Sequence, residues 1–297
     1  MVFFGKIVAA FFEWGAYAVL RLVGWKRKTV LANAKHVSSP VNYDELLINL
    51  TRHVGELLFC FGTFKKLPRD FATYPCCMDG WTFDIAEGSA PVLEKMRKGG
   101  IFLTAHYGNY EAMGPWLCRL GIPLVASYIP VKPKWLNSIL ERRIRAVDGR
   151  SYSVDARTPR DFLRILNDGK LFCLLSDQDS RIPSALPGTL LGQPANVNPL
   201  PDFLLEHRPQ TPVFICWMEE ICGVRVLHAV EVGRAQLPGP VHPASPALFK
   251  AASPAESSIV NSQFNKWLEQ RIIENPNLWY SFTHRRFYSR SPEIYGG

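Results

Sequence analysis

Residues 100–120 have the sequence GIFLTAHYGNYEAMGPWLCRL, and they decide the fold more than any other stretch of the chain. The apolar run at its start is typical of a buried strand over residues 100–105. Gly108 and Asn109 are typical of a tight turn and a helix N-cap, so a helix is predicted over residues 109–120. A buried strand followed at once by a helix is the repeating unit of α/β folds.

The same alternation continues along the chain. Short apolar runs predict further strands at residues 123–128, 171–176, 212–220 and 224–232. Helices are predicted at residues 134–148, 158–168 and 256–274. Thr158 suits an N-cap and Pro159 the first helical position, while the Pro-, Ala- and Ser-rich stretch 237–255 is interpreted as a loop. We therefore predict an α/β fold with a mostly parallel central sheet flanked by helices.

Two segments precede this alternating region. Residues 29–80 are predicted to be a helical lead-in, because apolar residues recur at helical spacing between positions 46 and 61. Residues 1–28 are predicted to be an amphipathic membrane anchor, followed by a single α/β domain over residues 29–297. No apolar run reaches the ~18 residues that a spanning helix needs.

The anchor prediction comes from the distribution of polar residues near the N-terminus. On a helix, Lys6, Glu13, Tyr17 and Arg21 fall on one narrow stripe, and the rest of the surface is apolar. Such a helix is typical of the bilayer interface, where the basic run 26–28 would meet anionic headgroups. The alternative is a helix packed on the domain core.

The net charge is +8, from 34 Lys and Arg against 26 Asp and Glu. Residues 1–36 hold six basic residues and one acidic residue, so five of the eight excess charges lie beside the most apolar segment. A nucleic-acid-binding protein would carry basic residues more widely, so this distribution favours an anionic membrane surface and argues against DNA or RNA as partner.

The cysteines and the known cofactor motifs limit the chemistry further. The seven cysteines are odd in number and form no C-x-x-C pair, which indicates reduced thiols in a cytosol-facing protein. The sequence has no glycine-rich phosphate loop, no G-x-S-x-G motif and no dinucleotide-binding fingerprint. We therefore expect no cofactor and no metal.

The first candidate site follows the strand at 100–105. His106 comes directly after this strand, and Glu111 falls in the first turn of the next helix, where the helix dipole favours a carboxylate. Glu111 could hold one tautomer of His106 and leave the other nitrogen as a general base. The alternative is a structural histidine beside a capping carboxylate.

The second candidate site follows the strand at 171–176, where Asp177, Gln178 and Asp179 form a D-x-D motif. The two aspartates could hold a divalent metal and a nucleotide sugar, as in some glycosyltransferases. They could instead orient a substrate or a neighbouring arginine, or simply form a polar loop.

Two basic groups are candidates for phosphate binding. Arg142 and Arg145 are three residues apart and share a face of the helix predicted at 134–148. His284, Arg285 and Arg286 follow an aromatic stretch near the C-terminus. A solvated charged helix is the alternative for the first group.

Together and in this order, these groups resemble the lysophospholipid acyltransferase superfamily, and within it the bacterial lipid A late acyltransferases of the lauroyl and myristoyl type. The segment 99–114, GGIFLTAHYGNYEAMG, is similar to that family's strand leading into H-x4-D/E. Later blocks resemble its other motifs: YIPVKPKWLNSILERRIRAVDG (128–149), LNDGKLFCLLSDQD (166–179), LLGQPANV (190–197) and NPNLWYSFTHRRF (275–287).

The resemblance implies an acyltransferase at the cytoplasmic face of the bacterial inner membrane. It would move a fatty acyl chain from acyl carrier protein, or from acyl-CoA, to a hydroxyl of a lipid A precursor or a related glycolipid. His106 would be the general base and Glu111 its partner. The residues expected to bind substrate are Arg145, Arg142, Asp177, Gln178, Tyr128, Asn109, His284, Arg285 and Arg286.

Three alternatives stay open at this point. The acceptor could be a lysophospholipid or another lipid. A metal-dependent D-x-D glycosyltransferase is the rival from another enzyme class, and a membrane-bound scaffold that keeps the fold without activity is the non-enzyme rival.

Overall fold

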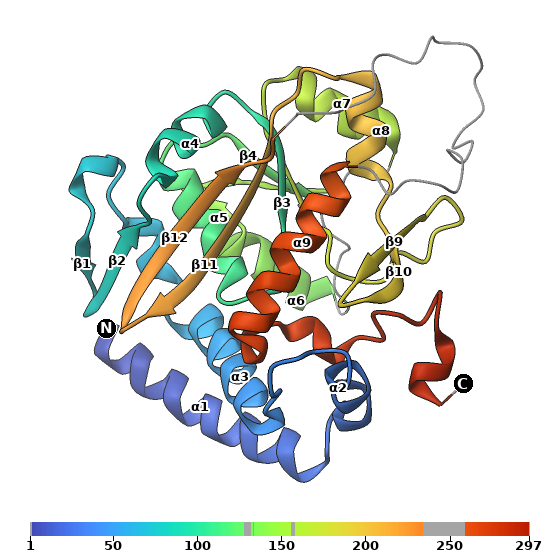
Figure 1. Cartoon of the computed structure of the whole chain (residues 1–297). Helices are drawn as coiled ribbons and strands as arrows, with labels where there is room; N and C mark the ends of the chain where they lie inside the picture. Colours follow the sequence, from blue (N-terminus) through green and yellow to red (C-terminus); the bar gives the residue numbers. More distant parts are fainter. Residues whose placement is uncertain (1, 128–131, 133, 156–157, 234–258, 297) are drawn as a thin grey trace.

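The computed structural model describes residues 2–127, 132, 134–155, 158–233 and 259–296. Its centre is an eight-stranded mixed sheet with helices on both faces (Figure 1). The strands lie in the order β1 (Cys76–Met78), β2 (Trp81–Ile85), β12 (Val224–Glu231), β11 (Val213–Ile221), β3 (Gly100–Thr104), β8 (Leu171–Leu175), β4 (Leu124–Ser127) and β7 (Ser153–Val154).

The predicted α/β fold with a mostly parallel sheet is confirmed. The strands β2, β12, β11, β3, β8, β4 and β7 include five parallel pairings, and only β1–β2 and β11–β12 pair antiparallel in the eight-stranded sheet. The β1–β2 hairpin was not predicted. A second unpredicted hairpin joins β9 (Leu186–Leu190) to β10 (Gln193–Val197), and positive φ angles at Leu191 and Gly192 form its two-residue turn.

The described helices surround this sheet. They are α1 (Val2–Leu22), α2 (Arg27–Ala34), α3 (Tyr43–Phe59), α4 (Ser89–Met96), α5 (Tyr110–Arg119), α6 (Lys134–Ile139), α7 (Pro159–Asn167), α8 (Leu200–His207) and α9 (Ile259–Glu274). The predicted cap of α7 is confirmed, since Thr158 accepts a hydrogen bond from the Asp161 amide in a capping box. The predicted loop 237–255 and the predicted start of the last helix at residue 256 lie outside the described residues.

The helix predicted over residues 134–148 is shorter than expected. It ends at Ile139, continues as a π turn over Leu140–Ile144, and gives way to the hairpin of β5 (Ala146–Val147) and β6 (Arg150–Ser151). Asp148 and Gly149 both have positive φ, and an Asp-Gly pair in this conformation favours a hairpin turn over a helix.

The core lies in two layers, one on each face of the sheet, because successive strand residues point to opposite faces. Ile101 and Leu103 of β3 join the layer that α3, α7, α8 and α9 cover, whereas Phe102 joins the layer under α4 and α5. Both layers are fully buried at these positions, so β3 and its neighbours are fixed from both sides. A sheet held in this way can position loop residues at its edge accurately.

Helix α1 is amphipathic as predicted, but its polar stripe faces the protein. Glu13 packs against Gly55 of α3, Lys6 lies over the Trp81 ring at 4.8 Å, and Arg21 pairs with Asp44. The opposite side, which we call the apolar face of α1, is exposed and consists of Ile7, Phe11, Trp14, Val19 and Leu22. Phe11 is 77% and Leu22 88% exposed, so no described part of the protein covers this face.

No single described helix is long and apolar enough to cross a bilayer. The segments Gly5–Leu22 and Arg27–Ala34 reach the required length and composition only as a pair, and they are bent against each other by 83°.

Candidate active site

The best candidate for an active site lies where β3 and β8 end side by side. These strands are parallel neighbours, with Thr104 opposite Leu175. His106 and Asp177 each follow two residues later, so their side chains emerge together at the carboxyl edge of the sheet. Nδ1 of His106 lies 2.8 Å from Oδ1 of Asp177, and the His106 amide donates to Oδ2 at 3.1 Å.

Asp177 is a completely buried carboxylate with a full set of donors. Its Oδ2 also accepts hydrogen bonds from Nε1 of Trp279 at 2.9 Å and from Oγ of Ser281 at 2.6 Å. Burial raises the pKa of Asp177, but the charge of His106 and the hydrogen bonds from His106, Ser281 and Trp279 bring that pKa far below its usual range. The side chain is therefore ionised at neutral pH.

His106 is held in one orientation by this carboxylate. Because an ionised Asp177 can only accept, Nδ1 carries the proton, and Nε2 is the nitrogen available to a substrate. Burial lowers the pKa of His106, but the charge and hydrogen bond of Asp177 and the charge of Glu111 raise it above its usual value. The side chain is 24% exposed, and in the described part of the chain Nε2 has no hydrogen-bond partner.

The loop that carries His106 is fixed by the segment 276–286, which we call the closing segment. The Tyr280 amide donates to the His106 carbonyl at 2.8 Å, and the Gly108 amide donates to the Leu278 carbonyl at 3.0 Å. Gly108 has a positive φ of 57°, and a Cβ there would collide with the Met218 carbonyl oxygen. Only glycine lets the loop pass this close to β11.

The prediction that Glu111 holds the imidazole of His106 is wrong, because Asp177 makes that hydrogen bond. Oε1 of Glu111 instead lies 3.4 Å from Nη2 of Arg145, which comes from the end of the π turn. The physical reason is the strand register, which places Asp177 in line with Nδ1. Glu111 remains close enough that its charge contributes to the raised pKa of His106.

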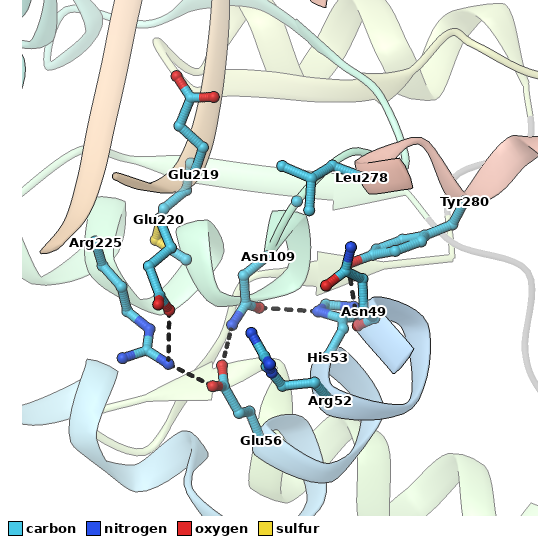
Figure 2. A pocket seen from close by; sticks show the side chains of 12 residues that line it. Asn49, Arg52, His53, Glu56, Asn109, Glu219, Glu220, Arg225, Leu278 and Tyr280 are labelled. Carbon is cyan, nitrogen blue, oxygen red and sulfur yellow. Dashed lines mark hydrogen bonds and ion pairs between the residues drawn. The ribbon is translucent and has the colours of Figure 1, made fainter. Parts of the chain in front are cut away.

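Asn109 occupies the N-cap position of α5 as predicted, but its side chain does not cap the helix. Its Oδ1 lies 3.0 Å from Nδ1 of His53, and its Nδ2 donates to Glu56 at 2.7 Å (Figure 2). Arg225 of β12 forms an ion pair with the same carboxylate. These groups line a pocket of about 60 Å³ behind the loop and tie α3 to the start of α5.

His53 is a neutral member of this network. Burial lowers its pKa to about 4, although the hydrogen bond to Asn109 opposes this shift. Its ring centroid lies 4.9 Å from that of Tyr110 and 5.5 Å from that of Tyr280, while the Tyr110 ring also contacts His106 at 4.9 Å. Sequence analysis missed His53, Glu56 and Arg225 because none has a motif; only a folded arrangement reveals their connection to Asn109.

The other predicted site residues lie in different environments. His284 is exposed, and its ring centroid lies 6.4 Å from that of His106. Arg286 is fully buried and donates to the Asn196 carbonyl at 2.9 Å, so it cannot contact substrate directly, whereas Arg285 and Arg142 are exposed. Gln178 is half-buried beside Asp177, and Tyr128 lies outside the described residues.

The two aspartates of the D-x-D motif do not face one site. Asp177 is surrounded by the donors described above, and Asp179 accepts hydrogen bonds from the amide and hydroxyl of Ser289 at 3.3 and 2.7 Å. Among the described residues, no group of three or more His, Cys, Asp or Glu side chains is arranged to hold a metal ion.

No protein-family model matches the chain, and no curated protein matches its sequence.

Proposed function

We propose that this protein is an acyltransferase that moves a fatty acyl chain from an acyl thioester to the hydroxyl of a lipid acceptor. The observation that carries the proposal is the pair of His106 and Asp177. A buried carboxylate fixes Nδ1 of the imidazole at 2.8 Å, and Nε2 has no hydrogen-bond partner among the described residues. This arrangement is suited to removing a proton from a hydroxyl group.

In the proposed reaction, Nε2 of His106 takes the proton of the acceptor hydroxyl as its oxygen attacks the thioester carbonyl carbon. A C–O bond forms, and the tetrahedral intermediate then breaks its C–S bond. The departing thiolate receives the proton from the imidazolium, so the products are an ester and a thiol. Asp177 stabilises the imidazolium between these two steps.

Glu111 contributes a negative charge and Arg145 a positive charge at the same edge of the sheet. In the proposal, Arg145 and the exposed His284 recognise the anionic part of a substrate, and Glu111 orients the Arg145 guanidinium. Acyl carrier protein is the proposed donor, because an acidic carrier complements a protein with a net charge of +8. Acyl-CoA is the second possible donor.

The exposed apolar face of α1 supports a location on a membrane. Its polar stripe is already used in contacts with the protein, so the apolar face needs a cover of another kind. Lys26, in the turn after α1, and Arg27 and Lys28, at the start of α2, are exposed and would meet anionic headgroups. We propose that this face lies in the cytoplasmic leaflet of the bacterial inner membrane.

The proposed acceptor is a lipid A precursor or a related glycolipid, with a lysophospholipid as the alternative. The D-x-D glycosyltransferase is not favoured by any observation, because the Asp177 oxygens are occupied by protein donors.

Mass spectrometry of membrane lipids tests the proposal. Cells that carry the intact gene are compared with cells lacking it and with cells that carry His106→Gln. We expect one lipid species to gain the mass of one acyl chain only with the intact gene. Identical lipid profiles in all three strains, together with no thioester consumption by the purified protein in anionic vesicles, would overturn it.

A further inference from the structure

The hydrogen bonds on Asp177 are unevenly divided between its two oxygens. Oδ1 accepts only from the imidazole, whereas Oδ2 accepts from the His106 amide, Trp279 and Ser281. Trp279 and Ser281 belong to the closing segment, more than 100 residues away in sequence. The side chains of Asp177, Trp279 and Ser281 are completely buried, so no solvent competes for these hydrogen bonds.

The closing segment is itself firmly attached. Nδ2 of Asn33 donates to the carbonyls of Phe282 and His284 at 2.8 and 2.7 Å, and Asn277 is hydrogen-bonded to the start of α3. The donors that reach Asp177 therefore have fixed positions and are not side chains of a free loop.

The donors on Oδ2 matter because a buried carboxylate can hold an imidazolium too strongly. A histidine that stays protonated is not a base, and burial with few donors would concentrate the charge of Asp177 on its hydrogen bond to His106. Two uncharged donors on the far oxygen stabilise the same charge without adding a proton that could move to the substrate. These donors therefore weaken the attraction between the Asp177 carboxylate and the His106 imidazolium, so that His106 loses its proton more easily.

Other charged groups around the pair act on the same balance. The charge of Glu111 on α5 favours the imidazolium, whereas His53 on α3 and His284 on the closing segment disfavour it when they are protonated. The buried Arg286 guanidinium interacts with Asp177 and Asp179. Among the described side chains that touch the carboxylate directly, Trp279 and Ser281 are the two that carry no charge in any protonation state of the imidazole.

We propose that Trp279 and Ser281 are positioning residues, whose hydrogen bonds to Oδ2 share the charge of Asp177 and so keep His106 available as a base at neutral pH. This inference rests on the proposed function for its catalytic consequence. Its electrostatic content, the effect of Ser281 on the protonation of His106, can be measured without any activity.

The experiment uses the full-length protein labelled with ¹³C-histidine, and NMR follows the titration of His106, whose signal is identified by its loss in His106→Gln. We expect Ser281→Ala to raise the titration midpoint by on the order of half a pH unit or more. Ser281→Cys, which keeps a weak donor, should raise it less. In Trp279→Phe, which removes the N–H and keeps an aromatic ring, the midpoint should also rise.

Thr283→Val is the matched control. Thr283 is buried in the same segment and also loses one hydrogen bond, its donation to the Tyr280 carbonyl at 2.8 Å, but it does not touch Asp177. Its midpoint should equal that of the wild type. The acidic limb of the pH profile of kcat/KM should move to higher pH in Ser281→Ala by the same amount as the NMR midpoint.

An unchanged or lowered midpoint in both Ser281→Ala and Trp279→Phe, or an equal rise in Thr283→Val, would overturn the inference. A raised midpoint in a protein that consumes no thioester would support the electrostatic role of Ser281 and overturn the proposed function instead.

Discussion

His106 and Asp177 face each other because they occupy equivalent positions just after the ends of two paired strands. Thr104 and Leu175 are opposite one another in the register of β3 and β8, and each reactive residue follows two positions later. Their 2.8 Å contact is therefore set by backbone hydrogen bonds of the central sheet. Neither residue depends on a mobile loop to find the other, which suits a pair that must keep its geometry through a reaction cycle.

This geometry predicts that Asp177 contributes more to activity than Glu111. Asp177→Asn removes the negative charge that orients His106 and stabilises its imidazolium form. We therefore expect kcat/KM to fall on the order of 10²–10⁴-fold. Glu111→Gln should cost less, because Glu111 pairs with Arg145 and not with the imidazole. Both variants are compared by thioester consumption with the lipid acceptor present, with circular dichroism as the control for folding. A larger loss in Glu111→Gln would contradict the prediction.

The strands were predictable from sequence because their signals are local. The apolar runs at 100–105 and 171–176 are bounded by turns, and both appear as strands in the structure. His106 and Asp177 were each recognised at the end of a strand. Their contact was not predicted, because it depends on which strands are neighbours. Closeness in sequence favours Glu111 as the partner of His106, but the order of strands in the sheet brings Asp177 to the imidazole.

The network behind the loop was not predictable for a related reason. His53, Glu56 and Arg225 come from α3 and β12, and each forms part of an ordinary helix or strand pattern. The same limit applies to α1, whose two faces were recognised from periodicity. Which face would meet the protein depended on small residues such as Gly55, which leaves room for Glu13.

The ion pair of Glu56 and Arg225 predicts a large cost when one partner is removed. Both side chains are at most 10% exposed, so Arg225→Met leaves a buried carboxylate without its cation. We expect the free energy of unfolding to fall by about 3–5 kcal/mol, measured by urea denaturation. Arg69→Met is the control, because the Arg69–Asp148 pair is 70% and 58% exposed and should contribute at most about 1 kcal/mol. Equal losses in both variants would contradict this assignment.

The apolar face of α1 predicts how the protein binds to lipid vesicles. The double variant Phe11→Ser with Trp14→Ser should lower the partition coefficient onto anionic vesicles by about tenfold or more, because two exposed aromatic side chains no longer insert. Vesicle co-sedimentation measures this directly. Ile221→Ser, at an exposed position on the β11–β12 hairpin, is the control and should bind as the wild type does. A double variant with unchanged binding would rule out this face as the membrane contact.

Glu13 predicts a pH dependence in the packing of α1. Its side chain lies against Gly55, where burial and the charge of Glu56 raise its pKa to about 7, although Arg52 acts in the opposite direction. In the unfolded chain a glutamate titrates near ~4.3, so the folded protein binds this proton more tightly. The stability from Glu13 is therefore fully present below the unfolded pKa and is lost as the pH rises through about 7.

Glu13→Gln has no proton to lose at this position and should remove that part of the pH dependence. The measurement is the thermal unfolding midpoint of wild type and variant at about pH 5 and about pH 8. We expect the wild type to lose more stability between the two conditions than Glu13→Gln does. Because α1 also carries the apolar face, vesicle binding by the wild type should likewise fall more between these two pH values than vesicle binding by Glu13→Gln. An equal loss in both proteins would show that Glu13 ionises freely and that its contact with α3 does not respond to pH.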